Sequence, residues 1–244
     1  MKITFAVFVN VPSTLVSAAI KRDRLGGNDI DAFLKGESMN PLKNHWEDVC
    51  KAKKPSEASW FQPHLSKSLD LILQSGINSE ARIIDVGGGA STLVDDLLDK
   101  GYTNISVLDL SAAALEVSKK RLGSKVKEVD WIEGDITAVK LPEKHYDLWH
   151  DRAVFHFLTA PHDRKGYLEN LNRSLKVGGH LILATFSLKG PKRCSGLDIV
   201  RYSPETLQIE LGRNYHLLNS LEESHKTPFG TTQEFIYCLF QRQE

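Results

Sequence analysis

The chain has 244 residues, of which 41% are hydrophobic, and its 31 Lys and Arg residues balance 31 Asp and Glu residues. These values are ordinary for one globular domain with additions, and the absence of a basic excess argues against nucleic acid as a partner. No run reaches the ~20 apolar residues of a membrane span. Three widely spaced cysteines favour neither a disulfide framework nor a metal site. We expect a monomer or weak dimer with no membrane, nucleic-acid or metal partner.

Residues 1–44 are expected to form an N-terminal extension and linker, poorly ordered in part. The apolar run 3–9 follows Lys2, as in a targeting segment, but Asn10 and Pro12 interrupt the apolar region and argue against a secretory signal. Residues 21–44 are polar and contain glycines, which is typical of a linker. We expect a cytoplasmic protein, with a targeting segment as the open alternative, and a main domain over residues 45–244.

The main domain is expected to begin with a short amphipathic helix from His45, followed by a second helix with apolar residues between 65 and 73. Trp46 and Trp60 lie close to its start. Tryptophans bury a large area, so packing is the first expectation for both. The alternative is that Trp60 forms part of a lid over a bound ligand.

A glycine-rich turn organises the chain. Residues 82–86 form an apolar run typical of a buried parallel strand, and Gly87, Gly88 and Gly89 follow it. Helical spacing resumes at Leu93. Glycines allow a tight turn and a close approach of the backbone to a ligand, and the new helix N-terminus supplies free amides. The pattern predicts a nucleotide-type binding turn.

The residues around this turn indicate which nucleotide it binds. The dinucleotide fingerprint G-x-G-x-x-G requires glycine at position 92, where this chain has Thr92, so a nicotinamide dehydrogenase is disfavoured. Asp85 would repel phosphates, whereas it can hold an ammonium group. S-adenosylmethionine carries adenosine and an ammonium without phosphate. The D-x-G-x-G pattern of Asp85, Gly87 and Gly89 resembles the first motif of the class I S-adenosylmethionine-dependent methyltransferases.

A second acidic residue ends the next predicted strand, 104–109. Asp109 lies 20 residues beyond Gly89, the spacing of a carboxylate that binds ribose hydroxyls in a strand–helix–strand unit. The alternative is that Asp109 caps the following helix, but Ser111 suits the cap better. We assign Asp109, with the adjacent Leu110, to cofactor binding.

The third predicted strand, 129–133, leads into Gly134, Asp135 and Ile136. Asp135 can accept a hydrogen bond from an adenine amino group, and Ile136 offers an apolar face to the ring. An ordinary turn aspartate is the alternative.

The fourth predicted strand, 146–150, precedes the segment D-R-A-V-F-H-F-L at 151–158. Ligands of doubly wound sheets bind outside the carboxyl ends of the strands, beside the topological switch. We therefore expect Asp151 or His156 to orient or deprotonate the methyl acceptor. The alternative is that these residues fix the loop and the methionine end of the cofactor. The segment resembles the one that follows strand four in the family.

The C-terminal part is expected to contain a loop, 187–202, and an antiparallel hairpin of strands 215–221 and 232–240 at one sheet edge. Arg201 and Tyr202 in the loop are candidates for recognising an acceptor carboxylate, with surface packing as the alternative.

The resemblance covers about residues 45–244. It implies a three-layer αβα Rossmann-like methyltransferase fold with a seven-stranded, mostly parallel sheet and a C-terminal antiparallel hairpin. It also implies transfer of the methyl group of S-adenosylmethionine to a small-molecule acceptor by direct displacement. Protein lysine N-methylation and a non-catalytic, cofactor-binding regulatory role stay open. The predicted cofactor-binding residues are Trp60, Asp85, Gly87, Gly88, Gly89, Asp109, Leu110, Gly134, Asp135, Ile136 and Asp151. The predicted catalytic residues are Asp151 and His156, and the predicted substrate residues are His156, Arg201 and Tyr202.

Overall fold

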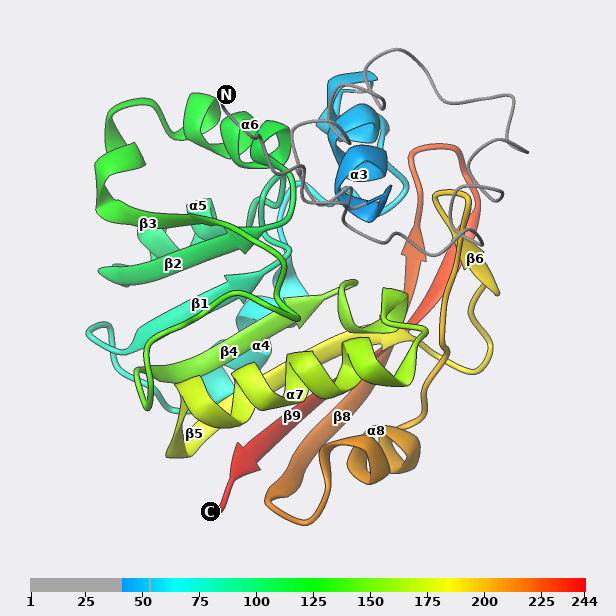
Figure 1. Cartoon of the computed structure of the whole chain (residues 1–244). Helices are drawn as coiled ribbons and strands as arrows, with labels where there is room; N and C mark the ends of the chain where they lie inside the picture. The colour runs from blue at the N-terminus through cyan, green and yellow to red at the C-terminus, as the bar shows by residue number, and fades with distance from the viewer. Residues whose placement is uncertain (1–40, 53) are drawn as a thin grey trace, which may run out of the picture. The chain divides into compact units, whose positions relative to one another are not determined.

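A seven-stranded sheet forms the centre of the computed structural model, which describes residues 41–52 and 54–244 (Figure 1). Its strand order is β3-β2-β1-β4-β5-β9-β8. The first five strands pair in parallel, and β9 runs antiparallel to both β5 and β8. The strands are β1 (Arg82–Val86), β2 (Asn104–Asp109), β3 (Val129–Glu133), β4 (Tyr146–Arg152), β5 (Leu175–Phe186), β8 (Tyr215–Lys226) and β9 (Thr232–Arg242). The predicted sheet and its C-terminal hairpin are confirmed.

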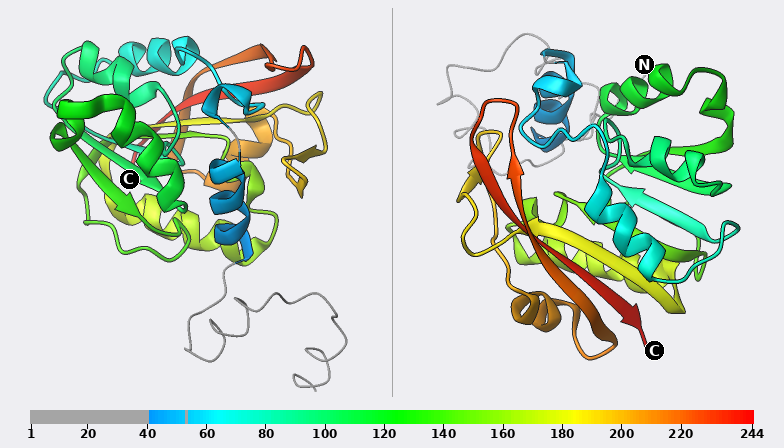
Figure 2. Two further views of the ribbon diagram at one scale, coloured as in Figure 1. Left: turned by 90° about the horizontal axis from the view of Figure 1, so that it is seen from above. Right: turned by 180° about the vertical axis from the view of Figure 1, so that it is seen from behind.

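Helices cover both faces of this sheet, as the front and rear views show (Figures 1 and 2). One buried cluster joins the sheet to α7 and α8, and a second joins it to α4, α5 and α6. The helices are α3 (Pro41–Ala52), α4 (Ser66–Gln74), α5 (Leu93–Asp99), α6 (Ala112–Leu122), α7 (Pro161–Ser174) and α8 (Pro204–Leu211), with 3₁₀ turns η1 (Pro55–Glu57), η2 (Gly123–Glu128) and η3 (Phe155–Phe157). A separate two-stranded ribbon pairs β6 (Arg193–Cys194) with β7 (Leu197–Asp198).

The two clusters follow from side-chain alternation along the strands. Ile83 belongs to the cluster of α4 and α5, whereas Ile84 belongs to the cluster of α7, and both are fully buried. A strand covered on both faces buries consecutive apolar residues, which is why β1 reads as a continuous apolar run rather than an alternating one.

Some boundaries differ from the sequence-based expectation, including the end of β9, which continues to Arg242. Helix α3 begins at Pro41, four residues before His45, and proline suits the first turn of a helix because its missing N–H has no intrahelical acceptor there. Strand β8 continues to Lys226, and β4 continues to Arg152. Residues 1–40, which hold most of the predicted N-terminal extension and linker, lie outside the described part of the chain. None of the helices in the described part is long and apolar enough to cross a membrane.

Candidate functional site

A cavity of about 160 Å³ lies over the carboxyl ends of the strands. We call the part lined by the glycine turn, Asp109, Leu110 and residues 134–136 the glycine half, because the ends of β1, β2 and β3 form it. We call the part lined by Trp46, Trp60, Phe157, Phe186 and Phe235 the aromatic half. Arg152, at the end of β4, also lines the cavity. The cavity therefore follows the strand order from β3 to β9.

The three glycines of the turn are required by packing within the protein. Gly87 has φ +74°, and a Cβ at this position would lie 2.1 Å from Val154 Cγ2. A Cβ on Gly88 would lie 2.2 Å from Asp85 Oδ2, and one on Gly89 would lie 2.6 Å from Asp109 Oδ2. Only glycine lets the turn close onto these two carboxylates.

Asp85 is buried at the end of β1, with 2% of its surface exposed. Its Oδ1 lies 2.7 Å from Nδ1 of His150, the residue in register on β4, and His150 Nε2 lies 2.8 Å from Ser68 Oγ. Because an ionised carboxylate only accepts, Nδ1 donates to Asp85. Asp85 Oδ2 is buried and has no hydrogen-bond partner within residues 41–52 and 54–244. A buried acceptor without a partner, in a residue that lines a cavity, is suited to a cationic donor of a ligand.

Asp109 accepts two backbone hydrogen bonds, from Gly89 to Oδ2 at 2.9 Å and from Ser111 to Oδ1 at 2.8 Å. Ser111 itself caps α6, because its side chain accepts from the Ala114 amide. The expectation that Ser111 rather than Asp109 caps this helix is confirmed. Burial, together with the charges of Asp85 and Glu47, raises the pKa of Asp109 to about 6, although the two amide hydrogen bonds act in the opposite direction.

The remaining predicted residues of the glycine half also line the cavity. Asp135 Oδ1 accepts from the Thr137 amide at 2.9 Å and from its hydroxyl at 2.7 Å, so Asp135 shapes the turn after β3 as well. Gly134, Ile136 and Leu110 contribute to the same wall.

Trp60 both packs and lines the cavity. Its ring meets Trp46 edge to face at 5.6 Å, and Trp46 meets Phe157 in the same way at 5.1 Å. All three rings line the aromatic half. Trp60 therefore packs against Trp46 and also lines the cavity, so the two roles that the sequence offered as alternatives are compatible.

Asp151 does not line the cavity, in contrast to the expectation for both its cofactor and its catalytic role. It is fully buried and accepts from the amides of Val154 and Phe155 and from the Tyr167 hydroxyl at 2.8 Å. Burial raises its pKa to about 6. Side chains alternate along β4, so Asp151 points to the opposite face from His150 and Arg152. The structure supports the alternative in which Asp151 fixes the loop after β4.

His156, Arg201 and Tyr202 are likewise absent from the residues that line the cavity. The His156 ring is fully buried and stacks on Phe186 at 4.6 Å. Burial, with a contribution from Arg152, lowers its pKa to about 3, so the imidazole is neutral at physiological pH. Arg201 donates to the carbonyls of residues 188 and 190, and Tyr202 is 2% exposed beside Phe155. The three residues that were predicted to contact the methyl acceptor therefore lie outside the cavity lining.

Arg152 is a cavity residue that the sequence reasoning did not select. Its Nε donates to the Tyr237 hydroxyl at 2.8 Å, and its Nη1 donates to the Trp60 carbonyl at 3.0 Å. The guanidinium carbon lies 4.8 Å from the centre of the Phe235 ring. Because side chains alternate along β4, Arg152 lies on the same face as His150, two residues before it. This alternation could have identified Arg152 from the sequence.

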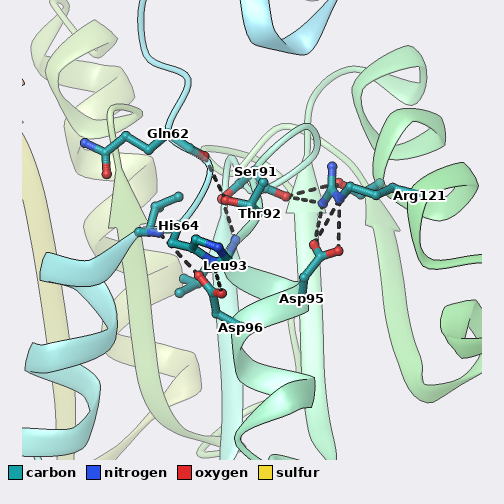
Figure 3. A network of polar contacts seen from close by, with 10 residues as sticks. Gln62, His64, Ser91, Thr92, Leu93, Asp95, Asp96 and Arg121 are labelled. Carbon is teal, nitrogen blue, oxygen red and sulfur yellow. Dashed lines mark hydrogen bonds and ion pairs between the residues drawn. The ribbon is translucent and has the colours of Figure 1, made fainter. Parts of the chain in front are cut away.

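The segment before α4 connects the two halves of the cavity. Thr92 Oγ1, at the glycine turn, donates to the Gln62 carbonyl at 3.0 Å, and His64 Nδ1 lies 2.7 Å from Asp96 on α5 (Figure 3). In the other direction, Gln62 Nε2 lies 3.2 Å from the Glu223 carboxylate on β8. Thr92, whose presence excluded the dinucleotide fingerprint, therefore anchors the cavity wall.

The fold and the site define a Rossmann-like domain with a cofactor cavity at the carboxyl ends of its parallel strands. Residues 84–183 match the family model described as a methyltransferase domain. The match identifies this part of the chain as an S-adenosylmethionine-dependent methyltransferase domain, which agrees with the fold that the chain shares with solved structures of such enzymes. The unpartnered Asp85 oxygen and the carboxylate of Asp109 suit the ammonium and ribose of that cofactor.

Curated relatives are distant. The chain is 22% identical over 145 residues to the eEF1A lysine and N-terminal methyltransferase of Mus musculus, covering 57% of this chain and 20% of the relative. It is 27% identical over 119 residues to the ubiquinone/menaquinone biosynthesis C-methyltransferase UbiE of Shewanella sp. (strain W3-18-1), covering 46% of this chain and 45% of the relative. The chain thus spans less than half the length of either relative.

One similar solved structure is the Burkholderia thailandensis 1,6-didemethyltoxoflavin-N1-methyltransferase with bound 1,6-didemethyltoxoflavin and S-adenosylhomocysteine. The TM-score is 0.60 at 15% identity, and the match covers 98% of this chain and 94% of that chain. This similarity supports the fold.

Proposed function

We propose that this chain transfers the methyl group of S-adenosylmethionine to a small-molecule acceptor by direct displacement. The observation that carries the proposal is the cavity itself. Its glycine half has the groups that suit the cofactor, and its aromatic half extends it over β4, β5 and β9. Aromatic walls contributed by α3, by η3 and by two strands favour an acceptor that is small enough to be enclosed.

Four residues of the glycine half would hold the cofactor. Asp85, with one oxygen fixed by His150, would hold the ammonium through its second oxygen. Asp109 would accept from the ribose hydroxyls. Asp135 and Ile136 would contact the adenine ring.

The cofactor supplies a methyl carbon already activated by a positively charged sulfur. The protein's task is then alignment and exclusion of water. Trp46 contacts both Trp60 and Phe157, and the three rings together would exclude water from the acceptor side. Since His156 and Asp151 lie outside the cavity, we assign no general base, and an acceptor that is already deprotonated needs none.

Protein lysine methylation is the second candidate, because the name of the Mus musculus relative includes that activity. A labelling experiment separates the two. Purified protein and methyl-labelled S-adenosylmethionine are incubated with either a protein-free metabolite extract or a dialysed, metabolite-free protein fraction. We expect label in a small molecule from the first mixture. Label only on protein in the second mixture would favour the lysine candidate.

Cofactor binding is tested separately by calorimetric titration with S-adenosylhomocysteine, S-adenosylmethionine and NAD. We expect micromolar binding of the first two, about −8 kcal/mol, and none of NAD. If NAD alone binds, the proposed function is wrong.

A further inference from the structure

We propose that Arg152 is the anion-recognition residue of the aromatic half, so that the methyl acceptor is a small aromatic or apolar molecule bearing a carboxylate. This inference rests on the proposed function and specifies its acceptor class.

The first support is the incomplete hydrogen bonding of the guanidinium. Nε and Nη1 are held by the Tyr237 hydroxyl and the Trp60 carbonyl. Nη2 is buried and has no hydrogen-bond partner in the part of the chain that the structure describes. A buried, charged donor without a partner is costly, and a ligand carboxylate is the acceptor that guanidinium binds most favourably.

The second support is how firmly Arg152 is held. The Tyr237 hydroxyl that accepts from its Nε donates in turn to Glu223 at 2.8 Å, and the guanidinium lies over the Phe235 ring at 4.8 Å. Two hydrogen bonds and the packing against the Phe235 ring fix the orientation of the Arg152 side chain in the absence of a ligand. A fixed group loses little conformational freedom on binding, which favours affinity.

The third support is position. Sheet order places β4 between the glycine half on β1, β2 and β3 and the aromatic residues Phe186 and Phe235 on β5 and β9. Among the described residues of β4, β5 and β9 that line the cavity, Arg152 is the only Lys, Arg, Asp or Glu. Glu223, which accepts from the Tyr237 hydroxyl, does not line the cavity, so Arg152 presents a positive charge on that wall, whereas Asp85 and Asp109 make the glycine half acidic. A cationic acceptor is disfavoured there and an anionic one is favoured.

The aromatic walls define the rest of the acceptor. Phe186 and Phe235 contact each other with ring centres 4.5 Å apart, and Trp46, Trp60 and Phe157 form the second aromatic group. Such a surface binds the apolar or aromatic body of a ligand, and Arg152 orients its single carboxylate.

The test uses matched pairs of probes, namely benzoate, phenylacetate and 3-phenylpropionate, each with its primary amide. Binding to the full chain saturated with S-adenosylhomocysteine is measured by calorimetry. We expect at least one carboxylate to bind at least tenfold more tightly than its amide. Arg152→Gln should lose that preference, Arg152→Lys should keep part of it, and both should bind S-adenosylhomocysteine within about threefold of the unaltered protein.

Arg201→Gln is the matched control, because the sequence indicated Arg201 as a carboxylate-binding candidate, whereas in the structure Arg201 donates to the carbonyls of loop residues 188 and 190 and does not line the cavity. It should keep the full preference. The proposal is overturned if the unaltered protein prefers no carboxylate over its amide, or if Arg152→Gln retains the preference. It is also overturned if Arg152→Gln chiefly weakens S-adenosylhomocysteine binding, because the guanidinium would then serve the cofactor. Thermal melts of each variant separate these outcomes from unfolding. Loss of the preference with intact S-adenosylhomocysteine binding leaves the proposed function standing, whereas failure of the unaltered chain to bind S-adenosylhomocysteine contradicts the proposed function itself.

Discussion

The imidazole Nδ1 of His150 lies 2.7 Å from Oδ1 of Asp85, and both side chains are at most 2% exposed. The pair joins adjacent strands in register, and Ser68 on α4 holds the other ring nitrogen. One carboxylate oxygen is therefore bonded to His150, and the other has no hydrogen-bond partner in the described part of the chain. Oδ2 is therefore the oxygen through which we propose that Asp85 binds a ligand.

Replacing Asp85 with Asn should lower S-adenosylhomocysteine affinity at least tenfold, about 1.4 kcal/mol or more, because the negative charge facing the ammonium is lost. Calorimetry checks the affinity. Asp163→Asn is the control, since Asp163 pairs with an exposed His162 and does not line the cavity. An Asp85→Asn affinity within twofold of the unaltered protein would contradict the role of Asp85.

His150→Leu should destabilise the fold by about 1–3 kcal/mol, because it leaves the buried Asp85 and Ser68 groups without their partner. Urea unfolding measures the change. Combining His150→Leu with Asp85→Asn should give less than the sum of the two single effects, since the side chains form one network. Additive effects would show that the pair is not coupled.

Cofactor binding should weaken as pH falls through about 6. Asp109 has its pKa raised to about 6, so below this pH it becomes protonated and loses both its charge and its full capacity to accept from ribose hydroxyls. S-adenosylhomocysteine titrations between pH 5 and pH 8 check this expectation. Asp109→Asn should bind weakly at every pH with no midpoint near 6. A midpoint that persists in that variant belongs to another group, such as Asp151.

Gly87→Ala should destabilise the protein more than Gly178→Ala. Both glycines have positive φ, +74° and +78°, so both substitutions carry the left-handed cost of about 1–2 kcal/mol. A Cβ at Gly87 also collides with Val154, whereas at Gly178 it meets no atom of the described residues within 4 Å. The collision adds about 1–3 kcal/mol. Equal unfolding free energies for the two variants would contradict the close approach at Gly87.

His156→Phe should preserve methyl transfer and its pH profile. The buried imidazole stacks on Phe186, and both of its nitrogens lack partners in the described part of the chain, so an aromatic ring without polar atoms suits the site. Stability should be unchanged or higher by about 1 kcal/mol. A large fall in the rate constant with an intact fold would restore the catalytic role that the sequence indicated for His156.

The fold and the glycine half were predictable because their signals are local. An apolar run, a glycine turn and the 20-residue spacing to Asp109 identify consecutive strand ends, and parallel strands bring those ends together. The role of Ser111 follows from helix-cap chemistry alone.

The aromatic half was harder to predict, because it depends on which face of a strand each residue occupies. Strand β4 was expected to end at residue 150, which placed Asp151 in a loop facing the ligand. The strand continues to Arg152, so alternation turns Asp151 toward Tyr167 and places Arg152 in the cavity wall. Tyr237 and Glu223, which hold Arg152, come from a hairpin remote in sequence.

Gln62 is bonded at both ends, its carbonyl to Thr92 beside the glycine turn and its side chain to Glu223 on the hairpin. A shift of this residue therefore changes contacts both at the glycine turn and at the hairpin of β8 and β9, which carries Phe235 of the aromatic half. Binding of the cofactor and binding of the methyl acceptor should therefore be thermodynamically linked. Each ligand should change the binding constant of the other by the same factor. Removing the side chain with Gln62→Ala would uncouple the two binding events while leaving each half of the cavity in place.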